Sequence, residues 1–318
     1  MEGRKIIRFG NSSHVVSVPK SWIQENKLKK GDLVYFEQNS NGELVLWPKE
    51  REDVKEKKIT IDVNGKSVRD MEREIIAAYI KGFNILSIET SDLRKSSVTI
   101  KRILKNLVGI EILEKSSKEI VAADFLDIKN VSLKGVIKRM DTNIRSMFDD
   151  INSCLSEGSV CQEHFDEIYE TDTDVNKFYF LLWKITVMGL NNPSLLHKLK
   201  TDAVELVHTW WLAMSIERIG DELKRIARGL KDTKIKNGSI KRFREIFNTV
   251  KKTYIDATNA YYKNDTEAAY GITAKRRDIM GECETLSSKD RGTVNINEKV
   301  KTIQTQIHNI AKCTIYFT

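Results

Sequence analysis

The chain has 318 residues, of which 40% are hydrophobic and 31% are charged, and its formal net charge is +8. This length accommodates two or three domains, and the composition is that of an ordinary globular protein. No stretch approaches the ~18 consecutive apolar residues of a membrane span, and the N-terminus has no signal-peptide core, so we expect a cytoplasmic protein without membrane insertion. The positive charge permits an anionic partner, but its spread along the chain identifies none.

Residues 4–49 have the pattern of a small β module with one short helix. The predicted strands cover residues 5–9, 15–18, 33–37 and 44–47. A Gly-Asn-Ser-Ser cluster separates the first two strands, Pro19 begins the helix, and Gly31 ends it. So short a module, with few large apolar side chains and no cysteine, cannot close a core alone. We therefore expect it to pair with a second copy.

The module resembles the AbrB/MazE/SpoVT swapped-hairpin family over residues 1–50, most clearly in Val18-Pro19-Lys20 and Lys29-Lys30-Gly31-Asp32. The resemblance implies that two chains interleave their hairpins and that basic residues of the first strand and its turns contact DNA. Carried over by position, the candidate DNA-binding residues are Arg4, Lys5, Arg8 and Lys20. The alternative is a module that only dimerises and carries these residues as solvated charges.

A charged connector at residues 51–57 precedes a mixed segment, residues 58–127, which predicts a small α/β domain. The predicted strands are 58–63, 85–89, 111–114 and 120–123, and the predicted helices are 68–80 and 97–107. The segment has no Gly-rich phosphate loop and no catalytic motif, so we interpret it as a linker domain.

From Ser132 onward almost the whole sequence has the pattern of long helices. The predicted helices are 133–154, 163–190, 204–230, 241–264, 266–287 and 297–318. Two triplets of similar length predict an up-down bundle of two repeats, 132–231 and 240–318. The predicted fold class is therefore mainly α, with an N-terminal β module and a six-helix, two-repeat bundle.

Four polar residues of the first repeat form a candidate metal site. Glu217 and Asp221 lie four residues apart on the edge of an apolar seam, and nearby arginines could pair with them as a surface network. Asp172 falls within the apolar face of the preceding helix, with Asn176 beside it. A buried carboxylate needs a cation or a donor, and an all-oxygen cluster suits a hard divalent cation or non-haem iron. A Lys or Arg that reaches across the bundle is the alternative partner for Asp172.

The acidic motif resembles the signature of the PhoU family of phosphate-uptake regulators, in Ile216-Glu217-Arg218-Ile219-Gly220-Asp221 and in Asp172-x-x-Val175-Asn176. The resemblance covers about residues 132–318. It implies a six-helix bundle whose acidic motifs bind iron or other metals, and a role in restraining phosphate transport.

The second repeat departs from this pattern. Lys301 and Thr305 stand at about the positions where the acidic pair is expected. The companion helix offers Lys275, Arg276, Arg277 and Asp278 where carboxylates are expected. We therefore expect at most one metal site per chain, in the first repeat. The second repeat is either structural or binds an anion at Arg276 and Arg277.

The order of swapped-hairpin module, α/β segment and PhoU-like bundle resembles an archaeal group of phosphate-uptake regulators. It predicts a homodimeric, DNA-binding transcription regulator of phosphate uptake whose bundle senses phosphate status or binds a partner. The alternative is an adaptor that binds a phosphate transporter ATPase or a sensor kinase and uses the β module only to dimerise. An antitoxin fits the β module alone.

No catalytic activity is predicted. The five histidines stand apart, and no Ser or Cys lies in a nucleophile motif. The cysteines form no Cys-x-x-Cys pair, which predicts reduced, packed thiols: Cys154, Cys161, Cys283 and Cys313. A metal-dependent hydrolase is the least favoured class, because the sequence offers neither a second metal site nor a base.

Overall fold

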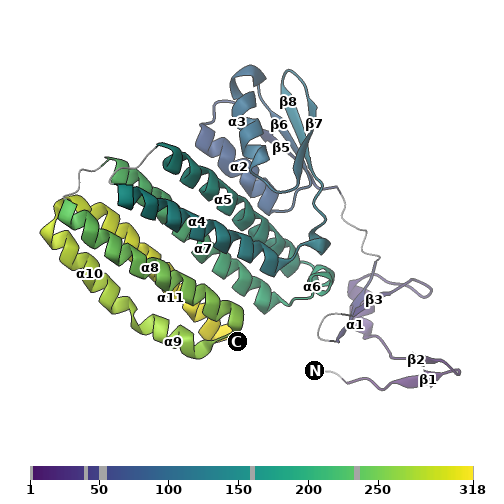
Figure 1. Ribbon diagram of the computed structural model, residues 1–318. Helices are drawn as coiled ribbons and strands as arrows, with labels where there is room; N and C mark the ends of the chain where they lie inside the picture. Colours follow the sequence, from purple (N-terminus) through teal and green to yellow (C-terminus); the bar gives the residue numbers. More distant parts are fainter. Residues whose placement is uncertain (1–2, 39–41, 50–55, 158–161, 233–236, 318) are drawn as a thin grey trace. The chain divides into compact units, whose positions relative to one another are not determined.

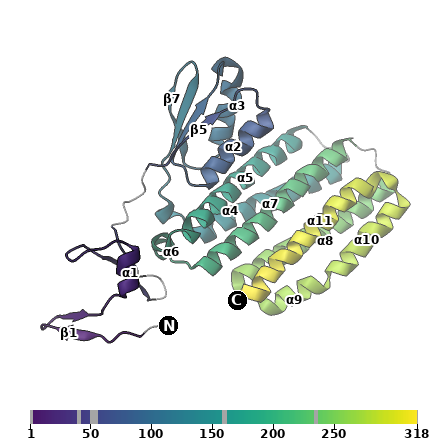
Figure 2. The same cartoon turned by 180° about the vertical axis from the view of Figure 1, so that it is seen from behind.

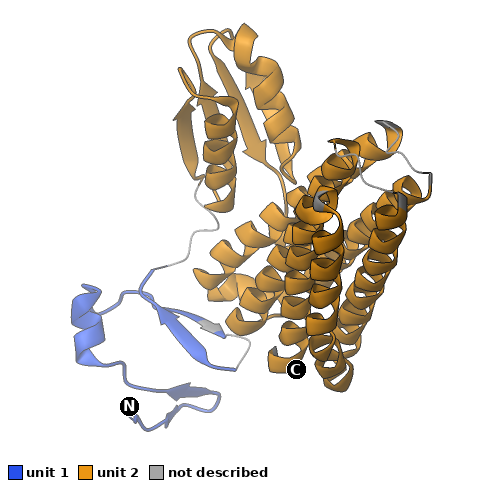
Figure 3. Cartoon of the chain, turned by 90° about the vertical axis from the view of Figure 1, so that its left-hand side faces the viewer, with its two compact units in different colours: residues 1–55 blue, residues 56–318 orange. Residues whose placement is uncertain are grey.

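Two compact units, residues 1–55 and 56–318, make up the chain in the computed structural model (Figure 3). The structure describes every residue except 1–2, 39–41, 50–55, 158–161, 233–236 and 318. Most of the predicted charged connector, and Cys161, therefore lie outside the described residues.

The first unit consists of two antiparallel hairpins and one short helix. Its elements are β1 (Ile7–Phe9), β2 (Ser13–Val15), α1 (Lys20–Glu25), β3 (Tyr35–Gln38) and β4 (Leu44–Trp47). Gly10 adopts a positive φ of 68° in the first turn, a conformation that costs glycine little. The second strand ends at Val15, earlier than predicted, because the following residues lead into Pro19, which has no backbone N–H to donate to a ladder.

The apolar side chains of the first unit have no core to enter. None of its described side chains is buried, and Ile6, Phe9 and Leu33 are 73%, 69% and 71% exposed. A module that folds stably normally buries such residues. The described residues of this unit thus present an apolar surface that is large for their number.

The second unit begins with a four-stranded sheet covered by two helices (Figure 1). Its elements are β5 (Lys58–Asp62), α2 (Val68–Ile80), β6 (Ile85–Glu89), α3 (Leu93–Lys105), β7 (Ile110–Lys115) and β8 (Glu119–Asp124). The strand order is β5-β6-β8-β7, and only β5 and β6 run parallel. Helix α3 begins four residues before the predicted start, because the Asp92 side chain caps it by accepting from the Arg94 amide.

Long helices form the rest of the second unit. They are α4 (Leu133–Glu157), α5 (Gln162–Leu190), α6 (Pro193–Leu199), α7 (Ala203–Asp232), α8 (Asn237–Lys263), α9 (Thr266–Ala274), α10 (Arg276–Lys289) and α11 (Val294–Phe317), with 3-10 turns at Ile128–Asn130 and Arg291–Thr293. Helix α11 lies along α7, and both contribute to one apolar core that α4, α5, α8, α9 and α10 share (Figure 2). None of the described helices is apolar over a length that would cross a bilayer.

Two helices differ from the prediction. The single helix predicted over 266–287 is interrupted at Lys275 and forms α9 and α10. Near this point the Thr273 hydroxyl donates to the Tyr270 carbonyl, an interaction that often bends helices. The prediction also missed α6. Its start was visible in the sequence, because Asn192 caps the helix and Pro193 is its first residue.

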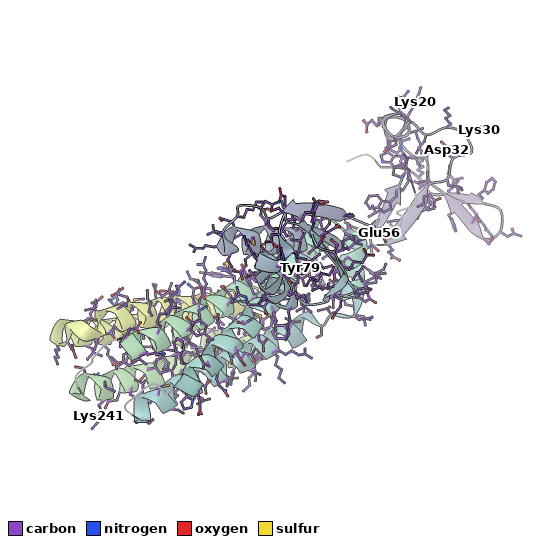
Figure 4. All side chains as sticks on the ribbon, turned by 90° about the horizontal axis from the view of Figure 1, so that it is seen from above. Lys20, Lys30, Asp32, Glu56, Tyr79 and Lys241 are labelled. Carbon is purple, nitrogen blue, oxygen red and sulfur yellow. The ribbon has the colours of Figure 1, made fainter. Side chains whose placement is uncertain are left out.

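Helix α5 joins the α/β part of the second unit to the bundle. Phe180 and Trp183 of this helix pack against the cores of both parts. The next residue, Lys184, forms a buried ion pair with Asp124 at the end of β8, and its ammonium lies 4.2 Å from the centre of the Tyr79 ring. Tyr79 is labelled in Figure 4, and its hydroxyl donates to the Val108 carbonyl at 2.9 Å. The sheet domain is therefore tied to the bundle by both apolar and charged contacts.

Candidate functional site

The four residues of the predicted metal site come together between α5 and α7, but they gather around a lysine. The Lys224 ammonium lies 2.6 Å from an Asp172 carboxylate oxygen and 2.9 Å from an Asp221 carboxylate oxygen. Asp172 is only 4% exposed, as expected of a carboxylate within an apolar face. The sequence analysis named a Lys or Arg from across the bundle as the alternative partner of Asp172, and Lys224 of α7 occupies that position.

Further hydrogen bonds complete the acidic cluster. The Asn176 amide donates to Asp172 at 3.3 Å, and the Arg225 guanidinium lies 3.2 Å from Asp221. Helix α7 approaches its neighbours closely at Gly220, where an added Cβ would meet Ile144 Cδ1 at 3.1 Å. A glycine between the two acidic positions therefore lets the cluster form against the bundle core.

Burial and mutual repulsion shift the protonation of this cluster. Burial raises the pKa of the Glu217 carboxyl to about 7, and the negative charges of Asp221 and Asp172 contribute to the rise. Burial also raises the pKa of Asp172, although the Lys224 hydrogen bond opposes it. Burial alone would lower the pKa of Lys224, but its hydrogen bonds to the two aspartates outweigh this and raise the pKa. The lysine therefore remains charged at neutral pH.

This arrangement does not fit a metal ion. The ammonium of Lys224 lies between the two aspartates that would coordinate a cation, and repulsion between the two positive charges would oppose metal binding. Among the described residues, no group of three or more His, Cys, Asp or Glu side chains is placed to hold a metal. The metal site at Asp172, Asn176, Glu217 and Asp221 stays a prediction. The residue that the sequence interpretation missed is Lys224, and its only local signal is its position three residues after Asp221.

The corresponding place in the second repeat is basic and polar. An Arg276 guanidinium nitrogen donates to the Thr305 hydroxyl at 3.3 Å. Lys301 pairs with Glu298 at 2.9 Å and with Glu284 at 3.5 Å. These contacts are compatible with a structural repeat, and the anion at Arg276 stays a hypothesis.

The predicted DNA-binding residues of the first unit are all solvent-exposed. Arg8 lies on β1 opposite His14 of β2, and the Arg4 guanidinium donates to the Ser17 hydroxyl at 3.3 Å. Lys5 immediately precedes β1, and Lys20, labelled in Figure 4, is the first residue of α1. Nothing buries these four charges in the described part of this unit, which leaves them accessible to an anionic partner.

The chain thus combines a small basic β module with an α/β domain and a helical bundle, and comparison with known families identifies the first and the last of these parts. Residues 137–230 match the model of the PhoU domain. Residues 7–53 match the model described as antidote-toxin recognition MazE, bacterial antitoxin. No curated protein and no solved structure matches the chain.

The chain therefore combines a MazE-type module with a PhoU domain, which confirms the predicted architecture. Both are regulatory families rather than enzyme families, and together they indicate a PhoU-related regulator. The PhoU match covers most of α4 and of α7, together with the helices between them. It stops before α8, where the acidic pattern is lost.

Proposed function

We propose that the protein is a dimeric, DNA-binding transcription regulator of phosphate uptake, with the PhoU domain as its sensing or partner-binding part. The observation that supports it best is the apolar surface of the MazE-type module. Eight large apolar side chains of this module are exposed: Ile6, Ile7, Phe9, Val15, Val16, Leu33, Phe36 and Leu44. A second copy of the module is the occupant that this surface and the family match favour.

Dimerisation would double the positive charge presented to DNA. Each chain contributes Arg4, Lys5, Arg8 and Lys20 from one short module, so a dimer would offer two such sets. Guanidinium and ammonium groups neutralise backbone phosphates, and the bound counterions they release make binding steeply dependent on salt. A state of the PhoU domain that alters the pairing of the modules would then alter DNA affinity.

Electrophoretic shifts with DNA fragments upstream of phosphate-transport genes, at several salt concentrations, test this function. The double variant Arg4→Ala with Arg8→Ala should weaken binding at least tenfold. It should also lower the slope of log K against log salt by about 3–4, since a dimer loses four phosphate contacts. The matched control is Arg94→Ala with Lys95→Ala on α3, where both side chains are at least 85% exposed.

The outcome also separates this function from the adaptor alternative. A dimer by light scattering that shifts no DNA at moderate salt, or a double variant that binds like the control, would contradict the DNA-binding role. Co-purification of the chain with a phosphate transporter ATPase or a sensor kinase would then support the adaptor.

A further inference from the structure

A pocket of about 590 Å³ lies between the sheet domain and the bundle, within the second unit. Helices α2 and α3 line it on one side and α5 and α7 on the other, and Figure 1 shows α2 next to α5. Its volume is within the ~300–1,000 Å³ range of small-molecule sites. It is much larger than an inorganic phosphate ion requires.

The wall formed by α2 and α3 is basic. Arg69 and Arg73 lie one helical turn apart on α2, and Arg102 lies in the last turn of α3. Against these three guanidiniums this wall carries one carboxylate, Glu72. Arg73 makes a long, exposed contact of 3.8 Å with Asp70, whereas Arg69 and Arg102 form no ion pair with another described residue. Two like charges at this spacing on one helix repel each other, so an anion between them would relieve the repulsion.

The opposite wall, formed by α5 and α7, carries three side chains with hydrogen-bond acceptors, beside Thr173 and the apolar Phe180. Glu217 and Asp221 contribute carboxylates, and Asn176, which donates its amide to Asp172, keeps its carbonyl oxygen as an acceptor. Asp221 is already neutralised by Lys224 and by an arginine of its own helix. Among the described residues, no ion pair crosses the pocket from the basic wall to the acidic one. The pocket therefore has the guanidiniums of Arg69 and Arg102, which form no ion pair with another described residue, on one side and the acceptors of Asn176 and Glu217 on the other.

We propose that this pocket binds a small phosphorylated molecule of the nucleotide class, with its phosphoryl group on Arg69, Arg73 and Arg102 and its amino or hydroxyl donors toward Asn176 and Glu217. Guanidinium forks match the geometry of phosphate oxygens, and three of them suit a dianion. The acceptor wall excludes a second anionic end and favours donor groups, which a nucleobase and a ribose both carry. This ligand site is additional to the DNA-binding role proposed above.

Isothermal titration of the full chain with the four ribonucleoside 5′-monophosphates, and separately with inorganic phosphate, tests the proposal. At least one nucleotide should bind with a Kd below about 1 mM, and at least about tenfold more tightly than inorganic phosphate. Arg102→Ala should weaken that binding about tenfold or more, and Glu217→Ala about threefold or more. Arg94→Ala is the matched control, because this arginine lies on the same helix, is 94% exposed and does not line the pocket.

Three results would overturn the proposal: binding of none of the four nucleotides, inorganic phosphate as tight as the best nucleotide, or unchanged binding by Arg102→Ala. Circular dichroism and thermal unfolding should show that Arg102→Ala is folded, and Arg69→Ala provides a second variant if it is not. The titrations contain no DNA, so their failure is distinguishable from failure of the DNA-binding function.

Discussion

Lys224 compensates the negative charge of the acidic cluster, and its removal tests how much the fold depends on it. Lys224→Met would leave Asp172 buried without its ion-pair partner. Removal of one partner of a buried pair typically costs about 3–5 kcal/mol, so urea unfolding at pH 8 should show a loss near the lower end of this range. The loss should be smaller at pH 5, because burial already raises the pKa of Asp172 and the carboxyl can take up a proton.

The matched control for Lys224 is Arg218, which lies on the same helix. Its side chain is exposed and forms no ion pair with another described residue, so Arg218→Ala should change the free energy of unfolding by less than about 1 kcal/mol. Equal effects of the two substitutions would contradict the central role of Lys224.

Glu217 predicts a specific dependence of stability on pH. Its pKa is about 7 in the folded chain against an ordinary value of 4.5, so the folded state holds a proton between these pH values that the unfolded state has released. Stability therefore falls as pH rises from about 4.5 to about 7 and is fully reduced above that range. Glu217→Gln cannot ionise, so it should stabilise the protein relative to the wild type, on the order of 2 kcal/mol more at pH 8 than at pH 5.

Denaturant titrations of the wild type and of Glu217→Gln at the two pH values measure this difference. Glu170→Gln on α5 serves as the control, because that side chain is exposed. A difference between wild type and Glu217→Gln that does not change with pH would contradict the raised pKa.

The candidate site was predictable only in part. The helical spacing of Asp172 among apolar residues predicts its burial, and the i, i+4 spacing places Glu217 and Asp221 on one edge of the next helix. The identity of the partner was not predictable, because a long lysine side chain on a polar position can reach several neighbours. Only the crossing of α5 and α7 brings Lys224 to Asp172.

At the scale of elements, the buried pair between α5 and β8 couples the sheet domain to the bundle. The side chains of Lys184 and Asp124 are 1% and 7% exposed. Lys184→Met should destabilise the second unit by about 3–5 kcal/mol, because it leaves a buried carboxylate without its ion-pair partner. The double variant with Asp124→Asn should recover most of the loss, since the amide carries no charge and its oxygen still accepts from the Leu126 N–H.

Urea unfolding of both variants measures this coupling. The control is Arg242→Ala, which removes an exposed pair with Glu282 at 3.3 Å and should cost less than about 1 kcal/mol. A double variant as unstable as Lys184→Met would show that the charges themselves, rather than the unpaired carboxylate, stabilise the junction.

Long elements were the most predictable ones. The apolar periodicity over α2 and the long bundle helices is strong enough to locate them from the sequence. Short elements depend on single caps and bends: α6 on Asn192, the start of α3 on Asp92, and the break between α9 and α10 near Thr273. The pocket between the sheet domain and the bundle could not be predicted, because only tertiary packing brings the arginines of α2 and α3 to the same pocket as residues of α5 and α7.

At the scale of the whole molecule, the two units differ in how they acquire a core. The second unit surrounds continuous apolar cores of its own. The described part of the first unit buries no side chain, and this is the observation that supports the proposed pairing with a second module. The stability of the second unit should therefore be independent of chain concentration. The folding of the first unit should depend on chain concentration, because it requires the proposed pairing.

If the exposed apolar surface of the first unit pairs two chains as proposed, the concentration of dimer depends steeply on the concentration of chains. Where most chains are unpaired, the quantity of dimer follows the square of the chain concentration, so halving the protein lowers the dimer about fourfold. In the proposed regulator, dilution by cell growth or a modest change in synthesis would then change the occupancy of operator DNA more sharply than the protein level itself changes. The proposed pairing of the modules would in this way make the regulator sensitive to gene dosage.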